Sequence, residues 1–484
     1  MTTRLNDLKP SHLWKHFEKI LEIPHCSGNE KKLGDYVLSV AAAHNLSARR
    51  DKVGNIVVEK KASPGYENAE GVILQGHLDM VGEKNSDTVH DFAKDPIRAY
   101  VEGEWVKAEG TTLGADNGIG LAAALAVMES DDLKHPPLEF LFTVDEETGL
   151  TGATRIKKGW LKGKKLFNLD SEDEGVFTIG CAGGADTEIF LPIKRKSAAS
   201  RDVHRLKLTG FRGGHSGLDI NQGRGNAIKL LARMLGLALL EFRFEIVSFE
   251  AGSKRNAIAR EAWADLKIPP AQLKKLTAFF KKTFADIQTE YKAVETEAAW
   301  SLKKNPDIRE APLTSESQSA LVHLLLALPH GVLAMHPEMK DLVETSTNLA
   351  IVRTTKSRIQ IVCSSRSSIA SALAAARLTI RAACELAGAK THQPDGYPGW
   401  MPKLDSPLLK TLREVYAKTF GKQAGVAAVH AGLECGIIGE KHPGMDMISF
   451  GPTMRNPHSP DEKVHIRSVE KFWKFIVEAL AALK

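Results

Sequence analysis

The chain has 484 residues, of which 43% are hydrophobic and 26% charged, and its formal net charge is +6. A chain of this length is too long for one hydrophobic core, so we predict two or three domains. Its composition is that of a soluble globular protein. The small net charge and the lack of long apolar runs or nucleic-acid motifs predict neither a nucleic-acid partner nor a membrane segment. The main basic run, residues 155–165, is interpreted as a solvated surface.

The five cysteines are widely spaced and contain no Cys-x-x-Cys pair. This pattern favours a reducing compartment over a disulfide framework or a cysteine-based zinc finger. The first thirty residues carry charged side chains throughout and lack the apolar core of a signal peptide. We therefore expect a cytoplasmic protein.

In chain order, helices and strands alternate at first. Apolar residues at helical spacing predict helices over 11–21, with Ser11 as N-cap, over 31–45, and from about 117 to 130. β-favouring runs predict strands near 55–58, 71–77, 138–143 and 165–169. This alternation is typical of an α/β fold, in which binding sites lie beyond the carboxyl ends of the strands.

The second of these strands runs into His77-Leu-Asp79. The two-residue period of a strand places His77 and Asp79 on the same side. There a carboxylate can hold the second ring nitrogen of a metal-bound imidazole. The alternative is a structural histidine that is hydrogen-bonded to a nearby acid.

A glycine-rich segment, residues 110–120, carries Asp116 and Asn117 just before the third helix. One interpretation is a helix N-cap with a tight glycine turn. The other is that the glycines let the backbone approach an ion closely while Asp116 bridges two metal ions. The two interpretations are compatible.

The next strand runs into three consecutive carboxylates, Asp145, Glu146 and Glu147. Adjacent carboxylates repel one another and lose hydration when buried, so they need cations or protons. A bound metal is the simplest explanation. Because neighbouring side chains of an extended segment point in opposite directions, one glutamate can bind metal while the other faces substrate as a general base.

Two further candidates complete an acidic and imidazole set. The strand at 165–169 ends in Asp170, and His458 lies in a proline-rich loop between a strand near 446–450 and the last helix. Two Zn²⁺ ions carry four positive charges, which one bridging hydroxide and three carboxylates would balance, with both imidazoles neutral. The three carboxylates are Asp116, Glu147 and Asp170.

Beyond about residue 184 the chain changes to charged strands and amphipathic helices, expected over 227–240 and 272–297. The segment 212–217 lacks the lysine of a P-loop, which argues against a nucleotide. Within it, His215 is either a structural histidine of a flexible turn or a donor to a developing oxyanion. Arg366, at the end of a strand over 357–366, can bind a substrate carboxylate bidentately, although most arginines at such positions face water.

The segment Tyr397-Pro-Gly-Trp400 is a boundary signal, after which the chemistry of the first part resumes. Glu434 lies in a glycine-bounded turn and is a candidate to face substrate. Its neighbour Cys435 lies near His430 in the sequence, but nothing activates it, so we interpret it as a buried, inert thiol.

Several of these segments together closely resemble the di-zinc aminoacyl-histidine dipeptidases of bacteria, also called peptidase D. The resemblance covers essentially the whole chain. The motifs that carry it are His77-Leu-Asp79, Leu113-Gly-Ala-Asp-Asn-Gly118, Glu146-Glu147, Asn168-Leu-Asp-Ser-Glu172, Gly213-Gly-His-Ser-Gly217 and Pro457-His-Ser-Pro-Asp-Glu462.

The resemblance implies an α/β catalytic domain with a central mixed sheet flanked by helices, residues 1–183 plus 399–484. An α+β lid or dimerisation domain, residues 184–398, would interrupt it and form a homodimer. Two Zn²⁺ ions per chain, replaceable by Mn²⁺ or Co²⁺, are also implied, as is a cis peptide bond between Asp116 and Asn117.

The same resemblance assigns roles to individual residues. His77 and Asp170 would hold one zinc, Glu147 and His458 the other, and Asp116 both. Asp79 would orient His77, and Glu146 would be the general base and later the acid. Lid residues that grip the substrate map to His215, Asn256 and Arg366.

The expected activity is hydrolysis of unblocked dipeptides, especially Xaa-His dipeptides such as carnosine, by a metal-bridging hydroxide. An N-acyl-amino-acid deacylase with the same two-metal centre is the alternative. A non-enzymatic metal-binding or scaffold protein is a more distant one, and it would have no use for Glu146 beside Glu147.

Overall fold

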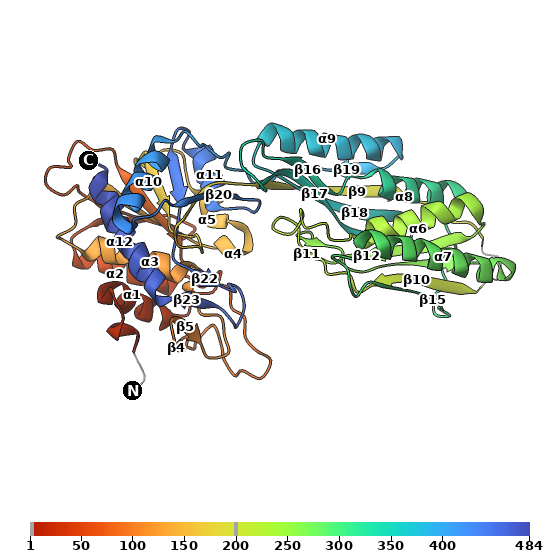
Figure 1. Cartoon of the computed structure of the whole chain (residues 1–484), viewed down its shortest axis with the longest axis horizontal. Coiled ribbons are helices and arrows are strands. Elements are labelled where there is room, and N and C mark those ends of the chain that lie inside the picture. The colour runs from red at the N-terminus through yellow and green to blue at the C-terminus, as the bar shows by residue number, and fades with distance from the viewer. Residues whose placement is uncertain (1–3, 198–201) are drawn as a thin grey trace. The chain divides into compact units, whose positions relative to one another are not determined.

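The computed structural model describes residues 4–197 and 202–484, which divide into two compact units (Figure 1). Unit 1 comprises Met1–Cys181, Trp400–Ala428 and Leu433–Lys484, and unit 2 comprises Ala182–Gly399 and Val429–Gly432. The predicted catalytic domain, residues 1–183 plus 399–484, included the segment Val429–Gly432. This segment instead belongs to unit 2, where the backbone N–H of Ala182 donates to the carbonyls of Val429 and Ala431.

Unit 1 is built on an eight-stranded sheet in the order β1-β2-β6-β3-β7-β21-β8-β20. Its central strands β6, β3, β7 and β21 run parallel, whereas β1, β2 and β8 pair antiparallel with their neighbours. The predicted mixed α/β architecture is thereby confirmed. The strands are β1 (Ser47–Arg50), β2 (Ile56–Lys60), β3 (Val72–His77), β6 (Leu138–Thr143), β7 (Lys165–Asn168), β8 (Val176–Cys181), β20 (Gly425–Val429) and β21 (Asp446–Ser449).

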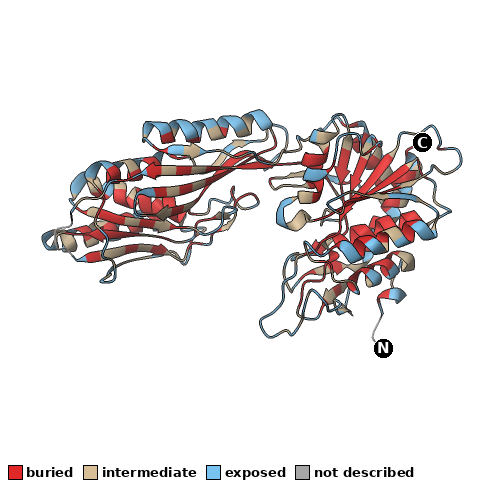
Figure 2. Ribbon diagram, turned by 180° about the vertical axis from the view of Figure 1, so that it is seen from behind, coloured by how far each residue is buried: buried red, intermediate tan, exposed pale blue. Residues whose placement is uncertain are grey.

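Helices cover this sheet. The helix α3 is buried along nearly its whole length because it packs against α1, α2 and β3 (Figures 1 and 2). The first predicted helix is confirmed, but its N-cap is Pro10, and Ser11 is its first residue. The helices are α1 (Ser11–Leu21), α2 (Lys31–Ala43), α3 (Ala115–Glu129), α4 (Glu146–Gly149), α5 (Thr151–Arg155), α10 (Pro407–Phe420), α11 (Glu434–Lys441) and α12 (Ile466–Ala482), after a short 3-10 turn, η1 (Leu5–Asp7).

A second, four-stranded sheet in unit 1 has the order β22-β23-β5-β4. The hairpin of β22 (Met454–Arg455) and β23 (Lys463–His465) pairs with β5 (Trp105–Ala108), which pairs with β4 (Ala99–Glu102). Val464 and its partner Val106 are both fully buried, which fixes the hairpin to β5. The loop 456–462 at the hairpin tip contains His458.

Unit 2 has its own hydrophobic core between a nine-stranded sheet and four helices, α6 (Ala227–Glu241), α7 (Pro270–Tyr291), α8 (Ser315–Ala327) and α9 (Ala370–Leu386). The predicted amphipathic helices correspond to α6 and α7. Figure 2 shows the exposed outer face of α9, the helix at the top of unit 2. The strands are β9 (Gly183–Pro192), β10 (Val203–Thr209), β12 (Glu245–Ala251), β14 (Ala262–Lys267), β15 (Ala299–Lys304), β16 (Gly331–Met335), β17 (Val343–Thr354), β18 (Arg358–Ser367) and β19 (Lys390–His392).

A separate two-stranded ribbon in unit 2 joins β11 (Gly214–His215) to β13 (Ala257–Ile258). Within the described residues of both units, no helix is long and apolar enough to cross a membrane.

Candidate metal centre

Three neighbouring parallel strands of unit 1 end beside one another. His77 closes β3, α4 with Glu146 and Glu147 follows β6, and Asp170 follows β7. The strand order β6-β3-β7 brings these ends to one edge of the sheet. The expected convergence at the carboxyl ends of the strands is therefore confirmed.

The Asp116 carboxylate lies between two imidazoles. Its Oδ1 lies 3.2 Å from His77 Nε2 and its Oδ2 lies 3.2 Å from His458 Nε2. A second carboxylate lies beside the same nitrogen of each ring, since Asp170 Oδ1 lies 3.2 Å from His77 Nε2 and Glu147 Oε1 lies 2.9 Å from His458 Nε2. Asp116 is thus the shared member of two three-residue groups.

Each of these groups can hold a metal ion. The ligand atoms of His77, Asp116 and Asp170 lie within 4.8 Å of one another, as do those of Asp116, Glu147 and His458. Carboxylate oxygens and imidazole nitrogens are the ligands that Zn²⁺ and related divalent ions take. The geometry therefore offers two adjacent ion sites with one common carboxylate.

The state of the buried oxygens also fits a pair of cations. Glu147 Oε1 and Asp170 Oδ1 are buried, and neither has a hydrogen bond of good geometry within the described residues, although an imidazole Nε2 lies 2.9 Å from the first and 3.2 Å from the second. A buried carboxylate that lacks donors is costly unless a positive charge lies beside it. The residues present therefore fit divalent ions.

The crowding of carboxylates around the two imidazoles shifts the pKa values of the cluster. Contacts with the carboxylates of Asp116 and Glu147 raise the pKa of His458 to about 11. Burial raises the pKa of Asp170 to about 8, and the nearby Asp116 carboxylate adds to the shift. With these raised pKa values, His458 and Asp170 keep their protons near neutral pH. Bound divalent cations would supply the same positive charge in place of those protons.

Glu146 and Glu147 were predicted to lie in an extended segment, but they do not. They form the first turn of the short helix α4, and both lie within ligand distance of His77. The turn forms because the Asp79 carboxylate accepts hydrogen bonds from both backbone N–H groups, at 3.0 and 3.1 Å. The predicted opposite directions of these two side chains are therefore wrong, although both side chains reach the cluster.

Asp79 supports His77 through two of its oxygens. His77 Nδ1 lies 3.0 Å from the backbone carbonyl of Asp79 and 3.4 Å from its Oδ1. Burial opposes ionisation of Asp79, but His77, the Glu146 N–H and the Ser27 hydroxyl outweigh it and lower the pKa of Asp79 to about 2. The carboxylate therefore stays charged and fixes both the imidazole and the turn of α4.

Asp116 is not the N-cap of α3. The N-cap is Gly114, and both Asp116 and Asn117 have non-helical backbone angles. The peptide bond between these two residues is cis, which confirms that expectation. The Asn117 side chain fits against β3 only because Gly76 has no Cβ, since one would lie 2.2 Å from Asn117 Oδ1.

Residues 73–482 match the sequence profile of peptidase family M20/M25/M40. The chain belongs to this family. It is 42% identical over 479 residues to the cytosol non-specific dipeptidase of Escherichia coli (strain K12), and the match covers 99% of each chain.

Two solved structures share the fold of this chain. The aminoacylhistidine dipeptidase of Vibrio alginolyticus superposes with a TM-score of 0.91 at 42% identity and covers 100% of this chain and 98% of its own. The aminopeptidase PepT of Bacillus cereus has a TM-score of 0.59 at 14% identity, covers 98% of this chain and 99% of its own, and shares the fold.

The predicted substrate residues of this M20/M25/M40 chain fall in unit 2, except for Glu434. His215 lies in β11, and Asn256, which is exposed, precedes its partner strand β13. His215 Nδ1 accepts the N–H groups of Gly217 and Leu218, at 3.3 and 3.1 Å, so the ring proton lies on Nε2. Burial, with the charge of Arg366, lowers the pKa of His215 and keeps the ring neutral.

Arg366 lies near the end of β18, and 8% of the residue is exposed. Its guanidinium donates to the Tyr397 hydroxyl at 2.9 Å, and its buried Nε has no hydrogen-bond partner among the described residues. The neighbouring ring of His430 has its pKa lowered to about 4 by burial and by the charge of Arg366. Arg366 therefore places a positive charge beside the rings of His215 and His430.

Glu434 is fully buried in unit 1. Its Oε2 accepts hydrogen bonds of 2.6 Å from both Gln75 and Thr143. Burial raises its pKa to about 7. Its contact with substrate stays a prediction.

Sequence reasoning missed the polar residues beneath the cluster. Gln75, which holds Glu434, also accepts a 2.6 Å hydrogen bond from Asn168, and both residues are buried in strands. The sequence does contain a signal for them, because each is a polar residue in an otherwise apolar strand. A buried polar side chain of this kind needs a hydrogen-bond partner, which predicts a buried polar network. Cys435, by contrast, is fully buried as predicted, and burial raises the pKa of its thiol.

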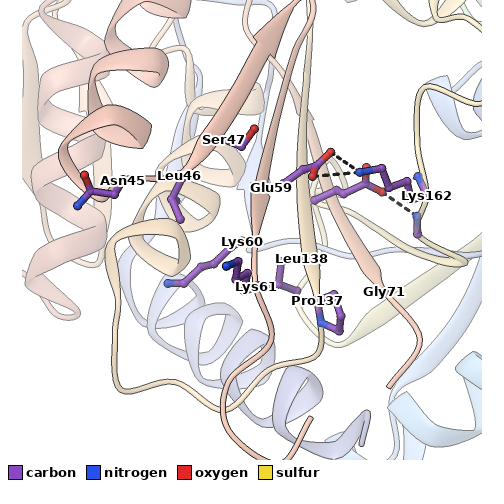
Figure 3. A pocket seen from close by; sticks show the side chains of 12 residues that line it. Asn45, Leu46, Ser47, Glu59, Lys60, Lys61, Gly71, Pro137, Leu138 and Lys162 are labelled. Atoms are coloured by element: carbon purple, nitrogen blue, oxygen red, sulfur yellow. Dashed lines mark hydrogen bonds and ion pairs between the residues drawn. The ribbon is translucent and has the colours of Figure 1, made fainter. Parts of the chain in front are cut away.

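A surface cavity of about 730 Å³ lies elsewhere in unit 1, near the starts of β3 and β6 (Figure 3). Glu59 and Lys162, which face one another there, are already paired at 2.9 Å. The charge of Glu59 in this cavity is therefore balanced by Lys162.

Proposed function

We propose that this protein is a cytoplasmic, metal-dependent dipeptidase that hydrolyses unblocked dipeptides, Xaa-His dipeptides such as carnosine among them. The observation that carries the proposal is the Asp116 carboxylate shared between two ligand groups, with Glu146 beside them. The names of the two relatives that are 42% identical over nearly the whole chain, a non-specific dipeptidase and an aminoacylhistidine dipeptidase, support the substrate class.

In this proposal His77 and Asp170 would hold one Zn²⁺, Glu147 and His458 would hold the other, and Asp116 would contribute to both sites. When bound, such ions lower the pKa of an attacking water and polarise the scissile carbonyl. Asp79 fixes the His77 ring through Nδ1, so that Nε2 stays directed at the site.

Glu146 is the proposed general base. Burial raises its pKa well above the ordinary value, and neighbouring carboxylates, Asp170 among them, add to the shift. A carboxylate with a raised pKa can accept a proton from water and later deliver it to the leaving amine. The Asp79 bond to the Glu146 N–H holds the residue in place for both steps.

Two residues of unit 2 would contact the substrate. His215, neutral with its proton on Nε2, would donate a hydrogen bond to the developing oxyanion. Arg366, oriented by Tyr397, would bind the C-terminal carboxylate of the dipeptide.

A dipeptide panel on the metal-reconstituted protein tests the substrate class. We expect free Xaa-His and other free dipeptides to be hydrolysed, and their N-acetylated forms to be poor substrates because they lack the free ammonium group. Chelated protein is the control. Faster hydrolysis of the N-acetylated forms would instead identify a deacylase.

Replacing Arg366 with alanine should lower kcat/KM for free dipeptides by about 10- to 100-fold, mainly through KM, because a hydrogen bond to a charged group is lost. Dipeptide amides, which lack the carboxylate, should show no further loss in the variant. Arg358→Ala is the matched control. It removes an arginine from the same strand, β18, but the guanidinium of Arg358 lies over the Phe190 ring and has no proposed contact with substrate. An equal loss with amides and free dipeptides would exclude the carboxylate contact.

A further inference from the structure

One buried carboxylate of unit 1 accepts four backbone hydrogen bonds from a single stretch of chain. Glu462 Oε2 accepts from the N–H groups of Leu113 and Gly114, at 2.7 and 3.0 Å. Its Oε1 accepts from those of Ala115 and Asp116, at 2.8 and 3.2 Å. Only 2% of Glu462 is exposed, so water does not compete for these bonds.

Glu462 and His458 belong to the same loop, the tip of the β22–β23 hairpin. The loop is closed by a 3.0 Å bond from the Glu462 N–H to the Ser459 carbonyl. Asp116 therefore meets this loop twice, since Oε1 of Glu462 accepts its backbone N–H and Nε2 of His458 faces its Oδ2. Because β23 is paired to β5, the loop is anchored to the strand that leads into residues 109–116.

A purely structural role for Glu462 is the simpler alternative. The first N–H groups of a helix need acceptors, and an anion at that end is stabilising. Gly114, the N-cap of α3, has no side chain to supply one. Capping explains why an acceptor is required, but the capped stretch includes Asp116 itself, so any movement of the cap also moves the shared carboxylate.

We propose that Glu462 is a positioning residue of the metal centre. It holds the main chain of Asp116 so that the two carboxylate oxygens stay directed at His77 and His458. The inference rests on the proposed function, since it assumes that Asp116 binds metal. Partners that orient metal ligands typically contribute 10- to 100-fold to metal affinity.

The test is the affinity of metal-free protein for Mn²⁺, measured by isothermal titration calorimetry. In Glu462→Gln the amide nitrogen cannot accept a hydrogen bond, so part of the N–H set loses its acceptor. We expect Mn²⁺ affinity to fall by about 10- to 100-fold. Glu139→Gln is the matched control, because Glu139 is 6% exposed and accepts the N–H groups of Lys162 and Gly163 at 2.8 and 2.7 Å, at the other end of β6.

Thermal unfolding of both metal-free variants separates the two roles. A positioning role predicts similar losses of Tm in the two variants but weakened Mn²⁺ binding only in Glu462→Gln. Unchanged affinity in folded Glu462→Gln would overturn the inference. If that variant does not fold, Glu462→Asp, which is one methylene shorter, replaces it with the same two outcomes. A wild-type protein that binds no Mn²⁺ would instead defeat the proposed function itself.

Discussion

Glu146→Gln should retain both metal ions and lower kcat by about 10²- to 10⁴-fold, the range attributed to general acid–base catalysis. The amide keeps the size of the side chain and the backbone bond to Asp79, but it cannot take a proton from water. The measurement is kcat on a free dipeptide together with metal content per chain.

The neighbouring glutamate is the matched control for this result. Glu147→Gln removes a proposed ligand that faces His458 at 2.9 Å, so it should lower metal content as well as turnover. Two variants with the same metal loss would show that Glu146 is a ligand and not the base. Full activity in Glu146→Gln would exclude it from proton transfer altogether.

Asp116→Ala should have the largest effect on metal binding, because it removes the one carboxylate common to both groups. We expect metal content to fall from two ions per chain to less than one after dialysis, and dipeptide hydrolysis to fall to background. Elemental analysis of the dialysed protein and a dipeptide assay measure the two quantities.

Asp173→Ala is the control for Asp116→Ala. Asp173 lies three residues beyond Asp170, but it is exposed and pairs with Arg455 at 2.8 Å, where an ion pair contributes little. This variant should keep both ions and full turnover. If Asp116→Ala retained two ions per chain, the shared-ligand arrangement would be wrong.

The positions of most candidate ligands could be predicted because they follow a local pattern. Apolar strands that run into His77, Glu146 and Asp170 mark the carboxyl ends of β3, β6 and β7, and parallel neighbours bring those ends together. A hydrophobic period of two residues is enough to detect such strands.

Local conformation at the site was harder to predict. The helical turn at Glu146 depends on hydrogen bonds from its backbone to the Asp79 carboxylate, and the backbone N–H of Asp116 is held by Glu462 instead of by an N-cap side chain. The bond from Leu113 to Glu462 joins residues 349 positions apart, and no periodicity signals such a contact. Tertiary hydrogen bonds overrode the local preferences at both positions.

Anomalous diffraction from crystals grown with Zn²⁺ tests the central claim most directly. The account predicts two zinc peaks in each chain, one against His77 and Asp170 and the other against Glu147 and His458, with the Asp116 carboxylate between them. A single peak, or zinc bound away from Asp116, would contradict it.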